Sequence, residues 1–184
     1  MGGVAGSLAN KHYDIEVYCD GACEPNPGES GSGVAVYRDG ILSELWYGLY
    51  DDQGTNNSAE LNALHQALLI AKEGIGIGKD VAVRSDSQYS IKCVTEWATS
   101  WRKKGWKRKK PGDIKNLEII QLAHQLYLEI KDEVVVSHVS AHVGIEGNEL
   151  ADRMAVFGID QMAPEFCRYS EALNVSEILA YRSG

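Results

Sequence analysis

The sequence predicts an α/β fold built on a mixed sheet, and three observations support that prediction. Three segments with the alternating pattern of strands come first, and Asp39-Gly40 joins the second and third as a two-residue hairpin turn. Helical and strand segments then alternate, and helical crossovers return strands parallel to an earlier one. The 184 residues, 44% of them hydrophobic, suit one domain with a sizeable core.

The opening strands are predicted over residues 14–20, 33–38 and 41–50. In the first, apolar residues at alternate positions, starting with Ile15, share one face. Asp20 stands where this strand ends, before the rigid turn "EPNPG". The three strands therefore form an antiparallel meander.

Helices and parallel strands follow the meander. In chain order we expect a helix over 58–73, a strand over 81–85, helices over 87–101 and 113–131, a strand over 133–140 and a helix over 147–157. Leu61, Leu64 and Leu68 recur at helical spacing in the first helix. Asn57 is its expected N-cap, and Gly74 marks its expected end. The total is a sheet of five strands, three antiparallel and two added in parallel.

Residues 13–158 form the predicted domain, with an N-terminal extension over 1–12 and a C-terminal extension over 159–184. The C-terminal extension forms either a terminal helix packed on the domain or a tail that binds a protein partner. The chain has no run of 18 apolar residues, and its first residues lack the pattern of a secretory signal. We therefore expect a cytoplasmic protein without membrane association, and we also expect it to be a monomer.

Basic residues gather in one stretch, although the whole chain carries a net charge of −8. Seven of its 18 lysines and arginines lie between Trp101 and Lys110. The stretch forms either a solvated helix end or a nucleic-acid surface, with cations on phosphates and tryptophans against sugar or base.

Four acidic residues stand at the ends of predicted elements: Asp20, Glu60, Asp86 and Asp152. Taken singly, Glu60 could complete a capping box with Asn57, and the aspartates could cap helices or start a turn. If the four converge, two like charges about 4 Å apart repel by about 4 kcal/mol at an effective dielectric constant of 20, unless cations intervene. Oxygen ligands suit Mg²⁺ or Mn²⁺, and two such ions can activate a water and stabilise the leaving oxygen of a phosphodiester.

The cysteines indicate neither a disulfide framework nor a zinc site. Cys19, Cys23, Cys93 and Cys167 include no C-x-x-C pair and no dense even spacing. We expect four reduced thiols.

Five motifs, taken together and in this order, resemble those of type 1 ribonucleases H. They are "CDGACEPNPG", "TNNSAELNAL", "SDSQY", "WATSWRKKGWK" and "AHVGIEGNELAD". The resemblance covers residues 13–158 and implies the family's five-stranded mixed sheet flanked by helices. It also implies hydrolysis of the RNA strand of RNA–DNA hybrids with two Mg²⁺ ions, for which Mn²⁺ can substitute, leaving 5′-phosphate and 3′-hydroxyl ends.

The resemblance implies roles for the acidic residues and one histidine. Asp20 would bridge both metal ions, and Asp86 and Asp152 would hold one each. Glu60 would help to hold a metal while contacting the ribose 2′-hydroxyl side of the substrate. His142, ten residues before Asp152, matches the family's loop histidine, which assists proton transfer or product release. The other histidines are expected to be structural.

The resemblance also assigns substrate contacts. Asn26, Asn57 and Gln88 match positions that contact the minor groove of the hybrid. Trp97 matches an aromatic residue beside the DNA strand. Thr55 and Asn116 match residues of the phosphate pocket. The basic substrate-binding protrusion is matched by Arg102, Lys103, Lys104 and Lys107.

Other positions refine this expected substrate surface. Trp101 and Trp106 are expected to pack the protrusion against the core. Gln53 stands where many relatives place an arginine of the phosphate pocket, so we expect a weaker grip on the DNA strand, unless the protrusion supplies it.

The leading hypothesis is a free-standing, metal-dependent endoribonuclease. The ribonuclease H domain of a reverse transcriptase shares the fold and chemistry, but the chain has no room for a polymerase. A catalytically silent hybrid-binding module, with the acids serving only as caps, is a second alternative. A labelled hybrid incubated with Mg²⁺ or with a chelator separates binding from cleavage.

Overall fold

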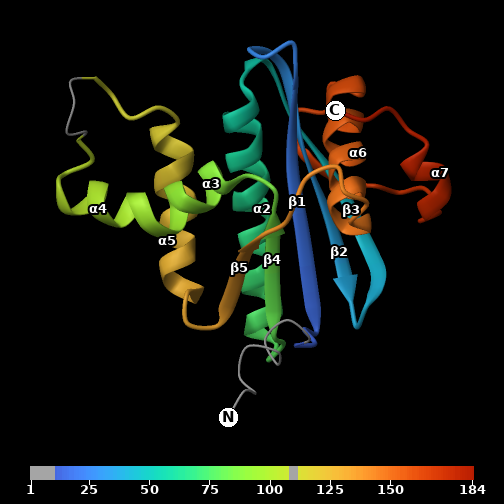
Figure 1. The fold of residues 1–184 in the computed structure, drawn as a ribbon, viewed down its shortest axis with the longest axis horizontal. Helices are drawn as coiled ribbons and strands as arrows, with labels where there is room; N and C mark the ends of the chain where they lie inside the picture. Colours follow the sequence, from blue (N-terminus) through green and yellow to red (C-terminus); the bar gives the residue numbers. More distant parts are fainter. Residues whose placement is uncertain (1–10, 108–111) are drawn as a thin grey trace.

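The computed structural model describes residues 11–107 and 112–184. Its elements are β1 (Ile15–Glu24), β2 (Gly28–Arg38), β3 (Ile41–Gly54), α2 (Asn56–Gly76), β4 (Val81–Ser85), α3 (Gln88–Lys92), the π-helical turn η1 (Cys93–Trp97), α4 (Ala98–Lys103), α5 (Leu117–Ile130), β5 (Val134–His138), α6 (Glu146–Asp160), β6 (Phe166–Arg168) and α7 (Val175–Leu179). They form three layers, with α2 and α5 on one face of the sheet and α6 and α7 on the other (Figure 1).

The middle layer is one mixed sheet of six strands in the order β5-β4-β1-β2-β3-β6. β1, β2 and β3 are antiparallel neighbours, while β4 lies parallel to β1 and β5 parallel to β4. This arrangement confirms the predicted α/β class and mixed sheet. The predicted count of five strands was wrong by one, because β6 has only three residues, too few to show a periodic pattern.

β1 passes Asp20 instead of ending there, as the sequence had predicted. Its ladder with β2 continues through Asp20, which pairs with Gly33, to Glu24, which pairs with Glu29. The four residues of this extension, "GACE", lack apolar alternation, and backbone hydrogen bonds to the glycine-rich start of β2 hold them in the sheet.

Two apolar cores hold the three layers together. Val17 of β1, Leu64 of α2 and Ile120 of α5 belong to the core on one face. Leu45 of β3 and Met154 of α6 belong to the core on the other face. All five side chains are fully buried. Because α2 and α6 pack on opposite faces of β1, the acidic residues of both helices are fixed relative to that strand.

The segment predicted as one helix over 87–101 is three consecutive helical pieces. α3 gives way to η1 at Cys93, and α4 continues from Ala98. The helix predicted from Asp113 begins at Leu117, after Asn116 in the left-handed conformation. Within the described ranges, none of the helices has both the length and the apolar character of a membrane span.

The C-terminal segment packs on the rest of the molecule. β6 extends the sheet beyond β3, and Tyr169 and Ile178 are buried with residues of α6. α7 lies beside α6, and the C-terminus also lies near α6 (Figure 1). Residues 175–179 thus form a short helix packed on the domain, the first of the two forms expected for this segment.

Candidate active site

Three of the four predicted acidic residues meet at one place on the sheet. Carboxylate oxygens of Asp20, Glu60 and Asp86 lie within 4.8 Å of one another. The parallel register of β1 and β4 pairs Cys19 with Ser85, so the next residue on each segment, Asp20 or Asp86, stands at the same level of the sheet. The expected convergence is confirmed for these three residues.

Glu60 reaches the sheet because the first turn of α2 lies very close to β1. A Cβ atom placed on Gly21 would lie 2.8 Å from the Cβ of Ala59, so only glycine allows this approach. Ser32 on β2 donates a hydrogen bond from its hydroxyl to the carbonyl of Ala59 at 2.8 Å. These two residues set the position of the Glu60 carboxylate.

Glu60 takes no part in capping α2. The hydroxyl of Thr55 accepts a hydrogen bond from the Ser58 amide at 3.0 Å, and the Ser58 hydroxyl accepts one from the Thr55 amide at 2.9 Å. The prediction of Asn57 as the N-cap was therefore wrong, because Thr55 and Ser58 form the reciprocal capping box. The capping-box alternative for Glu60 is excluded.

Burial gives the two inner carboxyl groups raised pKa values. Asp20 and Glu60 are each 5% exposed, and Glu60 Oε2 has no hydrogen-bond partner among the residues that the structure describes. Burial raises the pKa of Glu60 to about 8, and the charge of Asp86 also raises it. Burial raises the pKa of Asp20 well above its ordinary range, and the charge of Glu60 raises it further. Without a cation, burial therefore favours the protonated forms of both carboxyls.

Asp86 is oriented by neighbouring elements. The buried Asn148 of α6 donates from Nδ2 to Asp86 Oδ2 at 3.0 Å. His138, the last residue of β5, contacts the carbonyl oxygen of Asp86 through Nε2 at 3.2 Å. Ser87, not Asp86, caps α3, because its hydroxyl accepts from the Ser90 amide at 3.1 Å. The capping alternative for Asp86 is thereby excluded.

Asp152 borders the three-acid cluster, but other groups contact its carboxylate. Arg153 Nη1 donates to Oδ2 at 2.7 Å, and the backbone N–H of Gly184 donates to both oxygens at 3.2 Å. Burial raises the pKa of Asp152, while the Gly184 N–H and the Arg153 guanidinium lower it. Its charge raises the pKa of Asp20 and Glu60, yet its oxygens are outside the group found within 4.8 Å among the described residues. The predicted meeting of all four carboxylates is therefore only partly realised.

The donor atoms of the cluster fit a hard divalent cation. Carboxylates supply only oxygen ligands, which Mg²⁺ and Mn²⁺ prefer. A cation would pair with the buried Glu60 Oε2 and would relieve the repulsion between the carboxylates. A second group, His12, Asp14 and Asp39, lies at the start of β1, but it is mostly exposed and, within the described part of the chain, contains no buried unpartnered atom.

His142 lies in the exposed loop between β5 and α6. Its backbone has a φ of 54°, and its charge contributes to lowering the pKa of Asp152. His124, by contrast, is buried with Nδ1 at 2.7 Å from the carbonyl oxygen of Val94, which confirms its predicted structural role.

The predicted minor-groove residues are exposed on segments next to the acidic residues. Asn26 lies in the turn after β1, Asn57 in the first turn of α2, and Gln88 at the start of α3. Asn26 Oδ1 accepts a hydrogen bond from the Asn56 amide at 3.1 Å. Asn26 therefore ties the turn to the start of α2.

The predicted phosphate-pocket residues both begin helices. Thr55 is exposed, but its hydroxyl is engaged in capping α2. Asn116 is half-buried at the start of α5 with a φ of 61°. Gln53 is exposed near the end of β3.

Aromatic side chains connect the predicted protrusion to the core. Trp97 is 39% exposed, and its ring centroid lies 6.1 Å from that of Tyr89 and 6.2 Å from that of Trp101. Trp101 and Trp106 pack against the core of α2 and α5, and Trp106 meets the His124 ring edge to face. This confirms that the two tryptophans anchor the segment, while Trp97 keeps an open face.

The basic residues of the protrusion lie at and after the end of α4, which projects away from the sheet (Figure 1). The predicted substrate-binding cations among the described residues are all exposed: Arg102, Lys103, Lys104 and Lys107. The further basic residues 108–110 lie outside the described residues.

Sequence reasoning missed three residues that contact the acids. Asn148 lies within the motif "AHVGIEGNELAD" and Arg153 directly follows it, so their closeness to Asp152 in the sequence could have identified both. Gly184 lies 32 residues from Asp152, and no local pattern connects them.

Most of the chain is similar to known proteins. A family model described as RNase H matches residues 12–160. Ribonuclease H of Pseudomonas putida (strain W619) is 38% identical over 149 residues, which cover 80% of this chain and 95% of the relative. Ribonuclease HI of Pseudomonas putida (strain KT2440) is 37% identical with the same coverage.

Solved structures show the same similarity. LC9-RNase H1, a type 1 RNase H with the type 2 active-site motif, is 25% identical with a TM-score of 0.69, over 92% of this chain and 82% of its own. LC11-RNase H1, solved in complex with an RNA/DNA hybrid, is 26% identical with a TM-score of 0.56, over 80% of this chain and 98% of its own.

Proposed function

Because the chain belongs to the ribonuclease H family as a type 1 ribonuclease H, we propose that it cleaves the RNA strand of RNA–DNA hybrids at the acidic cluster. The observation that carries this proposal is the buried meeting of Asp20, Glu60 and Asp86, with Glu60 Oε2 unpartnered among the described residues. The hybrid bound to LC11-RNase H1 supports the choice of substrate.

We propose Mg²⁺ as the metal, with two ions per site when substrate is bound and Asp20, Glu60, Asp86 and Asp152 as ligands. Bound ions would supply an activated water and would offset charge on the scissile phosphate. The carboxyls must be ionised to act as ligands, and burial favours their protonated forms, so metal and protons compete for Asp20 and Glu60. Asn148 holds the Asp86 carboxylate in a fixed orientation for this task.

The exposed polar residues around the cluster would distinguish RNA from DNA. The amides of Asn26, Asn57 and Gln88 can donate to and accept from ribose 2′-hydroxyls and base edges in the minor groove. The open face of Trp97 would pack against a sugar of the DNA strand, and the cations after it would meet phosphates. Binding therefore uses the shape of the hybrid more than its base sequence.

His142 would complete the reaction by moving a proton. As the bond between phosphorus and the 3′-oxygen breaks, a protonated ring nitrogen of His142 would donate its proton to that oxygen. The products are then a 3′-hydroxyl end and a 5′-phosphate end. The exposed position of the loop lets the imidazole regain a proton from solvent.

The experiment compares cleavage of labelled hybrid, duplex RNA, duplex DNA and single strands, in Mg²⁺ and in chelator. We expect cleavage of the hybrid alone and only with Mg²⁺. Asp20→Asn keeps the shape and removes the charge, and it should lower the rate about 10³-fold or more. Asp14→Asn, on a partly exposed residue before β1, is the matched control. Wild-type turnover by Asp20→Asn would refute the assignment.

We further propose that the protein acts as a cytoplasmic monomer, which light scattering and cell fractionation would test. The packing of residues 159–184 on the domain favours an intramolecular role for them over a protein-binding tail.

A further inference from the structure

The end of the chain lies on the active-site residue Asp152. The Gly184 N–H donates to both carboxylate oxygens at 3.2 Å. A Cβ atom on Gly184 would lie 3.0 Å from Asp152 Oδ1 and 3.4 Å from the Cβ of Ala22, so the residue fits closely into this place. Ala22 follows Asp20 by two residues on β1. Gly184 therefore sits between α6 and β1, at the border of the acidic cluster.

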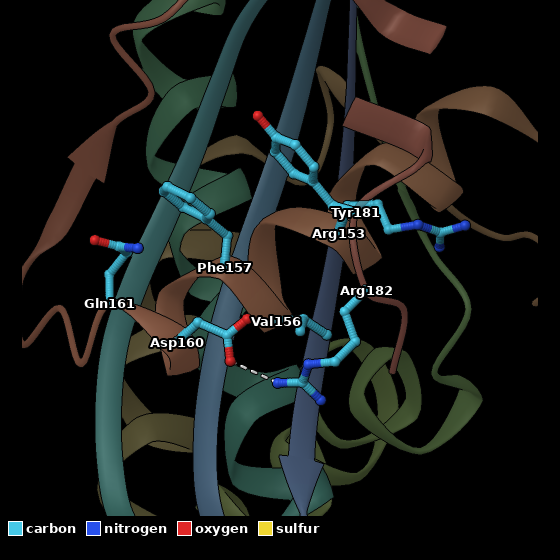
Figure 2. A pocket seen from close by; sticks show the side chains of 7 residues that line it. All are labelled: Arg153, Val156, Phe157, Asp160, Gln161, Tyr181 and Arg182. Carbon is cyan, nitrogen blue, oxygen red and sulfur yellow. Dashed lines mark hydrogen bonds and ion pairs between the residues drawn. The ribbon is translucent and has the colours of Figure 1, made fainter. Parts of the chain in front are cut away.

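Arg182 fastens this end of the chain to both elements. Its Nη2 donates to Asp160 Oδ1 of α6 at 2.6 Å, and its Nη1 pairs with Glu24 Oε2 at the end of β1. Figure 2 shows the guanidinium turned toward Asp160. The Arg182 side chain is 48% exposed, so solvent screens these ion pairs and they hold it only weakly.

Tyr181 supplies an aromatic anchor. Its ring stacks on Phe157 of α6 with the centroids 6.1 Å apart, and its hydroxyl shares a 2.7 Å hydrogen bond with that of Tyr169. A pocket of about 240 Å³ remains between Tyr181, Arg182 and α6 (Figure 2). Tyr181 is 39% exposed and is not among the residues of the buried core beside α6, so the segment is held at separate points on the surface.

Arg153 links the segment to the active site. Its Nη1 donates to Asp152 Oδ2 at 2.7 Å, and its Nε donates to the carbonyl oxygen of Leu179 at 3.3 Å. The groups that contact the Asp152 carboxylate are therefore a guanidinium and an N–H dipole with its positive end toward the oxygens. Both occupy acceptor positions of the carboxylate and repel an approaching cation.

We propose that residues 181–184, here named the C-terminal latch, compete with the divalent metal for Asp152. This inference rests on the proposed role of Asp152 as a metal ligand. The closed latch holds the carboxylate away from the three-acid cluster, and the open latch releases it. By thermodynamic reciprocity, the metal weakens the latch by the same factor by which the latch weakens metal binding. The latch thus sets the Mg²⁺ concentration at which the site fills.

Calorimetric titration with Mg²⁺ tests the latch on the full chain. We compare wild type, Arg182→Ala, and a chain that lacks residues 183–184. Both changes should lower the Kd for Mg²⁺ about 5- to 10-fold, at the lower end of the typical coupling between sites. Arg168→Ala removes an exposed arginine from the same C-terminal segment and should leave the Kd unchanged. An unchanged or higher Kd in the two latch variants would overturn the proposal.

Amide hydrogen exchange gives a readout that is independent of activity. Addition of Mg²⁺ to wild type should speed exchange at the Gly184 amide by about the same factor as the Kd change. Unaltered protection of this amide in saturating Mg²⁺ would also overturn the latch.

Asp20→Asn distinguishes failure of the proposed metal site from failure of the latch. If Asp20→Asn binds Mg²⁺ as wild type does, the proposed metal site itself fails. If it loses Mg²⁺ binding while the latch variants match wild type, the metal site stands and only the latch fails.

Discussion

The buried carboxyl of Glu60 makes the stability of the metal-free protein depend on pH, and Glu60→Gln isolates that dependence. The folded-state pKa of about 8 lies well above the ordinary value of 4.5. A raised folded pKa means that the folded state binds the proton more tightly than the unfolded chain does. Glu60 therefore contributes stability in full below about pH 4.5, and this contribution is lost as the pH rises through 8.

The size of the effect follows from the pKa difference. Between pH 5 and pH 8 the Glu60 carboxyl is ionised in the unfolded chain. In the folded chain it keeps its proton until the pH reaches its pKa of about 8. At 1.36 kcal/mol per pKa unit, the free energy of unfolding falls by at most about 4 kcal/mol over this range. Glutamine has the shape of the protonated acid without the titration, so Glu60→Gln should be the more stable protein at pH 8.

Urea unfolding in chelator at pH 5, 6, 7 and 8 measures this difference. Glu133→Gln, on an exposed turn, is the matched control and should follow wild type at every pH. Asp20 and Asp152 also have raised pKa values, so the free energy of unfolding depends on pH in both wild type and Glu60→Gln. The contribution of Glu60 is therefore the difference between these two proteins. If Glu60→Gln followed wild type to within about 0.5 kcal/mol throughout, the argument from burial would be refuted.

Magnesium should reduce the difference in stability between the two proteins at pH 8. A ligand that binds only the folded state at 100 times its Kd adds about 2.7 kcal/mol to the free energy of unfolding. Wild type should gain this stabilisation, and Glu60→Gln, with one ligand fewer, should gain much less. Equal gains would remove Glu60 from the metal site.

Three further predictions concern other residues of the site. Asn148→Ala should raise the Kd for Mg²⁺ and lower hybrid cleavage about 10-fold or more, because Asp86 loses its 3.0 Å hydrogen bond; unchanged values in calorimetry and cleavage assays would contradict this role. Thr55→Ala should cost about 1 kcal/mol in urea unfolding as the loss of an N-cap, whereas Asn57→Ala should cost clearly less. Alanine at the three cations at the end of α4, Arg102, Lys103 and Lys104, should weaken hybrid binding. It should also reduce the slope of log K against log salt by about 1 per phosphate contact, measured by fluorescence anisotropy. An unaltered slope would place these side chains away from the phosphates.

Local patterns in the sequence were enough to predict the fold class and the acidic residues. The Asp39-Gly40 hairpin and the periodic strand segments depend on neighbours a few residues apart, and such neighbours leave a readable pattern. The motif containing Asp20 and the motif containing Asp86 each follow a strand pattern, so their meeting follows once β1 and β4 pair in parallel. Errors arose where backbone pairing acts without a pattern, as in the extension of β1 beyond Asp20.

The sequence by itself therefore determined the α/β class and the acids that approach one another. Only the tertiary structure decided the raised pKa of Glu60, the orientation of Asp86 by Asn148, and the contact of Gly184 with Asp152. The physical reason is that periodicity and motif spacing record forces between residues close in the chain. Burial and hydrogen bonds between distant residues arise only when the packed layers bring those residues together.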